Sequence, residues 1–165
     1  MLLTNVAVGL VQLVVAILFA VLALYIGFAV LGKITRSFDA ETELARGNVA
    51  VGIVVAAVFF AIAIVVESGV AGLSGGINKA LEIGILTGDG LLTVTAAFLQ
   101  LILGVVLAIG AIYLALYILE KLTKGVTEFE ELRKGNIAVA LEMAGVIIAV
   151  AVIVQSGVLG ITTTL

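Results

Sequence analysis

Four long stretches of the sequence are almost free of charged residues, and this pattern limits the chain to a membrane fold. Residues 1–32, 49–66 and 91–119 carry no charge, and residues 137–154 carry only Glu142. The whole chain is 64% hydrophobic and 12% charged, whereas soluble domains are roughly half apolar and a quarter charged. A helix needs about 20 apolar residues to cross the hydrocarbon core of a bilayer. We therefore predict an all-α integral membrane protein with four transmembrane helices in the lipid bilayer.

The second half of the sequence repeats the first half at a distance of 88 residues. The match needs no gap, and it aligns polar residues that apolar composition alone would not align: Gln12 with Gln100, Tyr25 with Tyr113, Lys33 with Lys121, Asn48 with Asn136, and Ser68 with Ser156. We predict two tandem two-helix repeats, residues 1–73 and 91–165, joined by a Gly-rich outer connector over residues 74–90. Because each repeat has an even number of spans, the repeats are parallel, and we expect a pseudo-twofold axis along the membrane normal.

Basic residues gather on one side of the predicted membrane. Seven of the eight lie in the two connectors that join the spans within each repeat: Lys33, Arg36, Arg46, Lys121, Lys124, Arg133 and Lys134. The outer connector carries only Lys79. Because loops rich in Lys and Arg stay in the cytoplasm, we expect both repeated connectors to be cytoplasmic and both termini to lie outside.

A short motif marks the border between each cytoplasmic connector and the next span. It reads ELARGNVAV at residues 43–51 and ELRKGNIAV at residues 131–139. Glycine is favoured just after a helix end, and asparagine is favoured as the cap that starts a helix. We predict that a short connector helix ends at Gly47 or Gly135, and that a span begins at Asn48 or Asn136. The alternative is that the two asparagines line the mouth of a conduit.

The same borders carry a resemblance to a known family. The stretches ELARGNVAVGIVVAAVFFAIAIVVESGV (43–70) and ELRKGNIAVALEMAGVIIAVAVIVQSGV (131–158) resemble the two halves of the YjfL-like inner-membrane proteins, domain-of-unknown-function family number 350. The resemblance covers nearly the whole chain. It implies four spans in two repeats, an Asn-x-Ala step at the start of each second helix, and a prokaryotic inner-membrane location. It implies no activity.

Glu142 is the one charged residue inside a predicted span. Its neighbours on the helix surface are Ala138, Gly145 and Ala149, a small-residue face that allows another helix to approach closely. We therefore expect Glu142 to point into a helix contact or a cavity, and not into lipid. Two interpretations remain open, because an intramembrane carboxyl either carries protons or ions, or stays neutral in a hydrogen bond or near cytoplasmic water.

Other polar residues, in the spans or at their ends, complete a candidate intramembrane site: Tyr25, Tyr113, Gln12, Glu67, Gln100 and Gln155. Both tyrosines match the depth of Glu142, whereas the other four lie near the outer surface. Gln12 is expected at the depth of Glu67, and Gln100 at the depth of Gln155. Such outer pairs either clamp helices together or line an external vestibule. We also expect residues 77–86 to form a short helix in the outer interface, with a re-entrant loop as the alternative.

The composition limits the chemistry that the chain can perform. It contains no His and no Cys, so we expect no metal site, no cofactor and no enzymatic activity. The connectors are not basic enough for nucleic acid. Two functions remain. One is a structural or interaction subunit, expected to be homo-oligomeric, that docks a cytoplasmic protein through its connectors; the other is a small ion channel or proton-coupled transporter that uses Glu142. The thin polar content of the spans favours the first.

Overall fold

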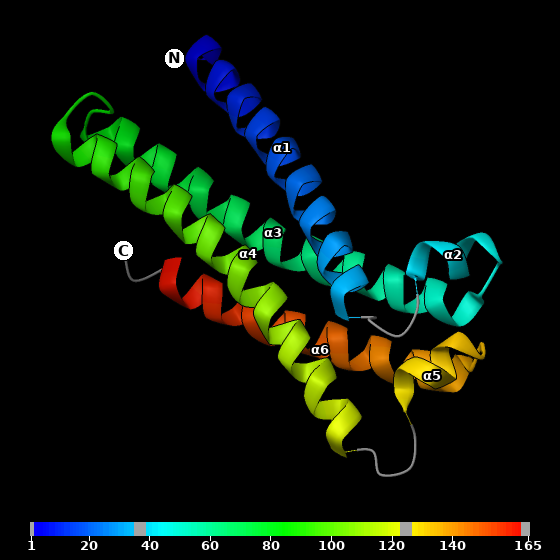
Figure 1. Ribbon diagram of the computed structural model, residues 1–165. Coiled ribbons are helices and arrows are strands. Elements are labelled where there is room, and N and C mark those ends of the chain that lie inside the picture. The colour runs from blue at the N-terminus through cyan, green and yellow to red at the C-terminus, as the bar shows by residue number, and fades with distance from the viewer. Residues whose placement is uncertain (1, 35–38, 123–126, 163–165) are drawn as a thin grey trace.

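The computed structural model describes residues 2–34, 39–122 and 127–162, and these residues form six helices (Figure 1). Four are long: α1 (Leu2–Ile34), α3 (Val49–Ile83), α4 (Gly88–Leu122) and α6 (Ile137–Thr162). Two are short: α2 (Ala40–Ala45) and α5 (Glu128–Arg133). The four long helices are long and apolar enough to cross a membrane. The all-α fold with four membrane-spanning helices in two repeats is thus confirmed.

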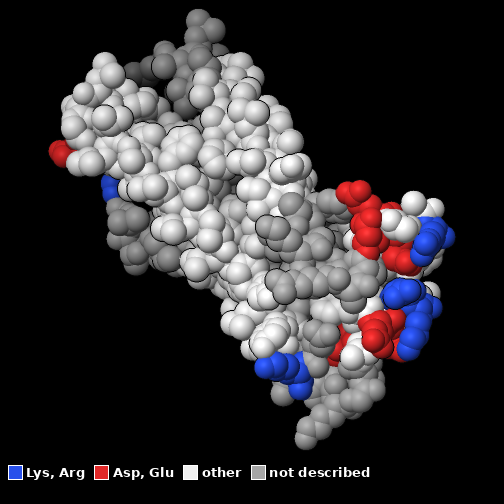
Figure 2. Space-filling view, in the orientation of Figure 1, with Lys and Arg blue, Asp and Glu red and all other residues white. Residues whose placement is uncertain are grey.

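Charged side chains gather at one end of the bundle. Figure 2 shows acidic and basic residues clustered around α2 and α5, and an apolar body between this end and the few charges at the opposite end. The described basic residues of the cluster include Arg46, Arg133 and Lys134, whereas Lys79 lies near the far end of α3. Lys33, Arg36 and Lys124 belong to segments whose side chains the structure does not describe.

Helix α3 is the centre of the bundle. It packs against α6 and α4, and less extensively against α1, where Gly27 lies directly against Ile62. The core around it is aliphatic and includes Val65, Ala108 and Ile147. By contrast, the N-terminal part of α1 leans away from the bundle (Figure 1), and most of its described side chains are exposed.

The Gly-rich stretch is mostly helical. Residues up to Ile83 continue α3 and only residues 84–87 form a turn, so the separate interfacial helix expected over 77–86 is wrong. The reason is packing: Gly76 has no side chain, which lets Ala97 of α4 approach closely. Gly84 ends α3 with φ of +97°, a conformation that glycine adopts without strain. The Thr87 hydroxyl then accepts a hydrogen bond from the Gly90 N–H and caps α4.

The two repeats do not bury the same faces. We call the residue 88 positions away the repeat counterpart. On α3, Ala50, Val54, Ala57 and Ala61 are buried, whereas their counterparts on α6, Ala138, Glu142, Gly145 and Ala149, are all exposed. A twofold axis between α3 and α6 would bury equivalent faces of both helices. The expected pseudo-twofold arrangement is therefore wrong. The two repeats contact each other through non-equivalent faces, which is a heterologous, or head-to-tail, contact.

Candidate functional site

The first border motif builds a tight helix-to-helix turn. The N–H of Asn48 donates to the Glu43 carbonyl (3.0 Å) and the N–H of Gly47 donates to the Leu44 carbonyl (2.9 Å). This pair of bonds is the Schellman pattern that ends a helix, and it requires the positive φ of +78° at Gly47. The Asn48 side-chain oxygen then accepts from the Val51 N–H (3.3 Å) and caps α3.

The second motif repeats this geometry. Gly135 has φ of +83°, and its N–H donates to the Leu132 carbonyl (2.9 Å). The Asn136 side-chain oxygen accepts from the N–H groups of Ala138 (3.1 Å) and Val139 (3.4 Å). In both repeats the same asparagine therefore satisfies N–H groups at the start of a membrane helix, where water partners become scarce.

Each turn also contains a small charged cluster. In the first, the Glu43 carboxylate accepts from the Arg46 guanidinium (3.1 Å) and from the Asn48 amide (3.1 Å). In the second, Glu131 accepts from the Lys134 ammonium (2.7 Å) and from the Asn136 amide (2.9 Å). The hydrogen bond from Asn136, and then that from Lys134, holds the pKa of Glu131 below its ordinary value. Glu131 in turn raises the pKa of Lys134.

Asn48 also joins the two repeats. Its amide donates to the backbone carbonyls of Leu132 (3.0 Å) and Arg133 (3.3 Å) at the end of α5. Asn136 has no matching bond to the first repeat among the described residues; its amide donates to Glu131 in its own turn. The first asparagine therefore ties the repeats together, and the second leaves the equivalent position open.

Glu142 faces outward from the single chain. It is exposed, and so are Ala138, Gly145 and Ala149 on the same side of α6. The expectation that Glu142 points into a helix contact or a cavity is therefore wrong within one chain. The reason is that α6 turns its other side, with Ala140, Ala144, Ile147 and Ala151, into the core. We call Ala138, Glu142, Gly145 and Ala149 the Glu142 face.

The expected tyrosine partners do not reach Glu142. Tyr25 is 74% exposed and Tyr113 is 47% exposed. No hydrogen bond joins Tyr25 or Tyr113 to Glu142 in the part of the chain that the structure describes. These three residues therefore do not form one polar site inside a single chain.

The outer polar residues pair differently from expectation. The Gln155 amide lies 3.4 Å from the Glu67 carboxylate, so that the two repeat counterparts clamp α6 to α3. The side-chain nitrogen of Gln12 is buried and has no hydrogen-bond partner among the described residues. Gln100 instead lines a cavity of about 450 Å³ between α3 and α4.

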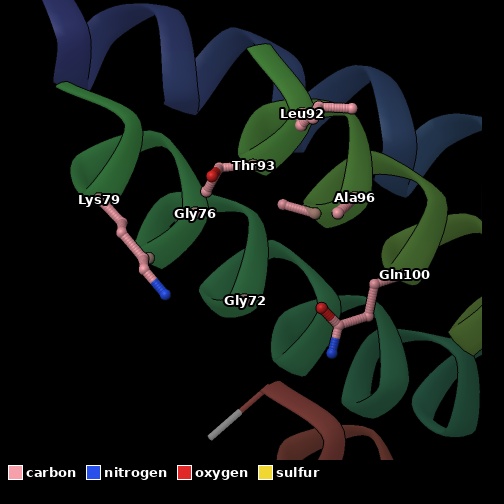
Figure 3. A pocket seen from close by; sticks show the side chains of 9 residues that line it. Gly72, Gly76, Lys79, Leu92, Thr93, Ala96 and Gln100 are labelled. Carbon is pink, nitrogen blue, oxygen red and sulfur yellow. The ribbon is translucent and has the colours of Figure 1, made fainter. Parts of the chain in front are cut away.

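Figure 3 shows this cavity, with Lys79 extending from α3 and Gln100 from α4. The rest of its lining is small or apolar apart from Thr93: Gly72, Gly75, Gly76, Leu92, Ala96 and Ala97. The cavity lies toward the end of α3 and α4 that is away from the charged turns, whereas Glu142 lies in the first turns of α6, near the charged turns. The buried core between these ends is aliphatic.

The sequence pattern did not predict the burial of Glu128. This residue starts α5 and is 1% exposed, and its carboxylate oxygens have no hydrogen-bond partner among the described residues. The run TEFEE at residues 127–131 is typical of a solvent-exposed acidic stretch, so its pattern predicts exposure and not burial. Its repeat counterpart, Ala40, is also buried, so the apolar counterpart was the one signal that could have revealed it.

No group of three or more His, Cys, Asp or Glu residues is placed to hold a metal ion in the described part of the chain.

Comparison with known proteins gives one match. The model of the family described as Domain of Unknown Function (DUF350) matches two segments of the chain, residues 4–102 and 93–165. No curated protein matches the chain, and no solved structure matches it. The matched segments together cover both repeats and nearly the whole chain.

Proposed function

The chain belongs to the DUF350 family of domains of unknown function, and from that premise we propose that it is a structural or interaction subunit of a membrane assembly. In this proposal the chain associates with copies of itself within the bilayer and performs no catalysis. Its two charged turns face the cytoplasm, both termini lie outside, and the membrane is the prokaryotic inner membrane.

The Glu142 face carries this proposal. Glu142 is exposed on a membrane-spanning helix and is surrounded by Ala138, Gly145 and Ala149. A carboxyl group directed at the hydrocarbon of the bilayer costs free energy. A face of small residues is the type of surface on which transmembrane helices associate. Both features are explained when another protein helix covers this face.

The apolar core supports the structural function over transport. The buried polar residues among those described are Glu43, Ser68 and Glu128. The Ser68 hydroxyl donates to the Val65 carbonyl within its own helix, and Glu43 belongs to the charged turn. A conduit through a single chain would need polar groups along its length. The alternative function is a small ion channel or proton-coupled transporter, and the observation that favours it is the accessible intramembrane carboxyl of Glu142.

The two charged turns are the proposed docking surface for a cytoplasmic protein. They lie at the same end of the bundle (Figure 2) and carry both signs of charge, including Glu41, Arg46, Glu130 and Arg133. The Asn48 bonds to the Leu132 and Arg133 carbonyls hold the two turns together. A rigid surface of mixed charge suits a protein partner of complementary charge.

One experiment separates the two functions. The wild type, Glu142→Gln and Glu142→Ala are purified, their masses are measured by native mass spectrometry, and proton and cation fluxes are measured in liposomes. We expect oligomers and no flux from the wild type, intact oligomers from Glu142→Gln, and weakened oligomers from Glu142→Ala. Gln keeps the shape and one acceptor of a neutral carboxyl but cannot carry a proton. Flux through the wild type that Glu142→Gln abolishes, with assembly unchanged, would establish the transporter instead.

A further inference from the structure

The contact between the two repeats leaves one helix face uncovered in each repeat. On α3 the buried face is Ala50, Val54, Ala57 and Ala61, which shares a core with the buried α6 residues Ala140, Ala144, Ile147 and Ala151. The counterparts of the first set are the exposed Glu142 face of α6. The counterparts of the second set are Gly52, Ala56, Phe59 and Ala63 of α3, of which Ala56, Phe59 and Ala63 are exposed and Gly52 is partly exposed. We call these four residues the Ala56 face.

The two charged turns also leave one set of hydrogen bonds unmade. The Asn48 amide bonds to the Leu132 and Arg133 carbonyls of the other repeat. The counterpart bonds would run from the Asn136 amide to the carbonyls of Leu44 and Ala45, and the described chain does not contain them. The Leu132 carbonyl accepts from both Gly135 and Asn48, and the Leu44 carbonyl accepts from Gly47 in the same way. A carbonyl oxygen has two lone pairs, so Leu44 can accept a second bond.

The outer half of the bundle gives a third, separate observation. Leu101 of α4 is 1% exposed and packs directly on Gly69 of α3. Their counterparts are Leu13 of α1 and Gly157 of α6. Leu13 is 56% exposed, and open space surrounds the position that a Gly157 side chain would take. Both halves of this contact therefore exist in the chain but do not meet within it.

We propose that a second copy of this chain continues the repeat contact: the Glu142 face and Gly157 of one copy pack against the Ala56 face and Leu13 of the next. The Asn136 amide then donates to the Leu44 and Ala45 carbonyls of that next copy. This inference rests on the proposed self-association and assigns its surfaces. The occupant is a second copy because the two open faces are counterparts of the two faces that already pack together within one chain. Such a contact is heterologous, so copies extend around a ring or along a row in the membrane. Glu142 is thereby removed from lipid.

Cysteine cross-linking tests this assignment, because the chain has no cysteine of its own. The double variant Leu13→Cys with Gly157→Cys is oxidised in membranes and its mass is read on a non-reducing gel. We expect most of the chain to shift into bands of dimers and larger species. The matched control replaces Leu13→Cys with Val14→Cys, since Val14 is equally exposed (55%) but is the counterpart of the exposed Ile102. We expect this control to stay monomeric.

Two more samples make each outcome decisive. The variant Gly69→Cys with Leu101→Cys reproduces the contact inside one chain, and we expect an intramolecular disulfide that leaves the chain a monomer. Co-expressed single variants Leu13→Cys and Gly157→Cys should give dimers that contain one of each, and neither should dimerise alone. Dimers of Gly157→Cys alone, without the mixed species, would show a twofold contact and overturn the head-to-tail proposal.

The native mass of the wild type tests self-association separately from the assigned surfaces. Oligomers that fail to cross-link through Leu13 and Gly157, while the Gly69 and Leu101 pair cross-links normally, would overturn the assigned surfaces and leave self-association standing. A monomeric wild type in membranes would overturn self-association and the assigned surfaces together.

Discussion

The side-chain amide of Asn48 donates a hydrogen bond to the backbone carbonyl of Leu132, which lies in the other repeat. This bond joins the start of α3 to the end of α5, and it holds the two charged turns side by side at the same end of the bundle. Asn136 occupies the equivalent place in the second turn but donates to Glu131 in its own repeat. The same motif thus has a local function in both repeats and a long-range function in only one.

Replacement of Asn48 by serine should therefore destabilise the chain more than replacement of Asn136. Serine keeps a capping oxygen at both sites, but Asn48→Ser loses the bonds to Leu132 and Arg133. With about 1 kcal/mol for each net hydrogen bond, the difference in unfolding free energy should be about 1–2 kcal/mol. Chemical unfolding of both variants in detergent, with the protein held monomeric, measures it. Equal losses at the two sites would contradict the long-range function of Asn48.

A leucine at either asparagine should cost more than serine, because leucine removes the cap as well as the amide. The expected additional loss is about 1 kcal/mol at each site. The same unfolding measurement tests it. If leucine were tolerated at both sites while an ion flux disappeared, the asparagines would line a conduit mouth and would not act as caps.

The Glu131 carboxyl should titrate below the ordinary glutamate range. The Asn136 amide is the largest cause of its lowered pKa and the Lys134 ammonium the next. A lowered pKa in the folded state means that the cluster stabilises the turn above about pH 4.5 and loses this contribution as the pH falls through the folded pKa. We expect Asn136→Ala to raise the pKa of Glu131 more than Lys134→Gln does. An NMR titration of the Glu131 carboxyl carbon decides this, and the reverse order would contradict the geometry.

Gly76 and Gly75 form a matched pair for the packing of α3 on α4. A side chain at Gly76 would meet the Ala97 side chain, whereas open space surrounds the corresponding position at Gly75. We expect Gly76→Ala to destabilise the protein by roughly 1–3 kcal/mol, since overpacking displaces a helix. Gly75→Ala should instead stabilise it by about 0.4–1 kcal/mol, because alanine restricts the unfolded chain. Thermal unfolding in detergent compares the two, and equal effects would show that α4 does not pack at Gly76.

Labelling of single cysteines tests the orientation in the membrane. Thr42 and Leu86 lie at opposite ends of the bundle, in α2 and in the turn between α3 and α4, and Leu86 is 98% exposed. We expect an impermeant thiol reagent to label Thr42→Cys only from the cytoplasm and Leu86→Cys only from outside, because basic residues gather near Thr42. Labelling of both from the same side would contradict the four-span topology. Thr163, near the C-terminus, is expected on the outer side and lies outside the described residues.

The sequence by itself determined the number of spans, the duplication and the border turns. Charge-free stretches long enough to cross hydrocarbon must be helical, because backbone groups in lipid can be satisfied only within the helix. The helix ends at Gly47 and Gly135 could be predicted because a left-handed turn favours glycine, and the φ values of both glycines are positive. Short connector helices were predicted to end at Gly47 and Gly135, and the structure has short helices just before these glycines, at Ala40–Ala45 and Glu128–Arg133. These features depend on the chemistry of residues that are close together in the sequence, so they can be predicted without the tertiary structure.

Only the tertiary structure decided which side of each helix is buried. The membrane helices are apolar on all sides, and lipid tails are as apolar as a protein core, so hydrophobic periodicity gives no signal for the buried face. This is why the exposure of Glu142, the pairing of Glu67 with Gln155 and the head-to-tail packing of the repeats differ from expectation. A duplication predicts two equivalent units, but the contact between them is set by shape. Here the shape buries Val54 of the first repeat and exposes its counterpart, Glu142.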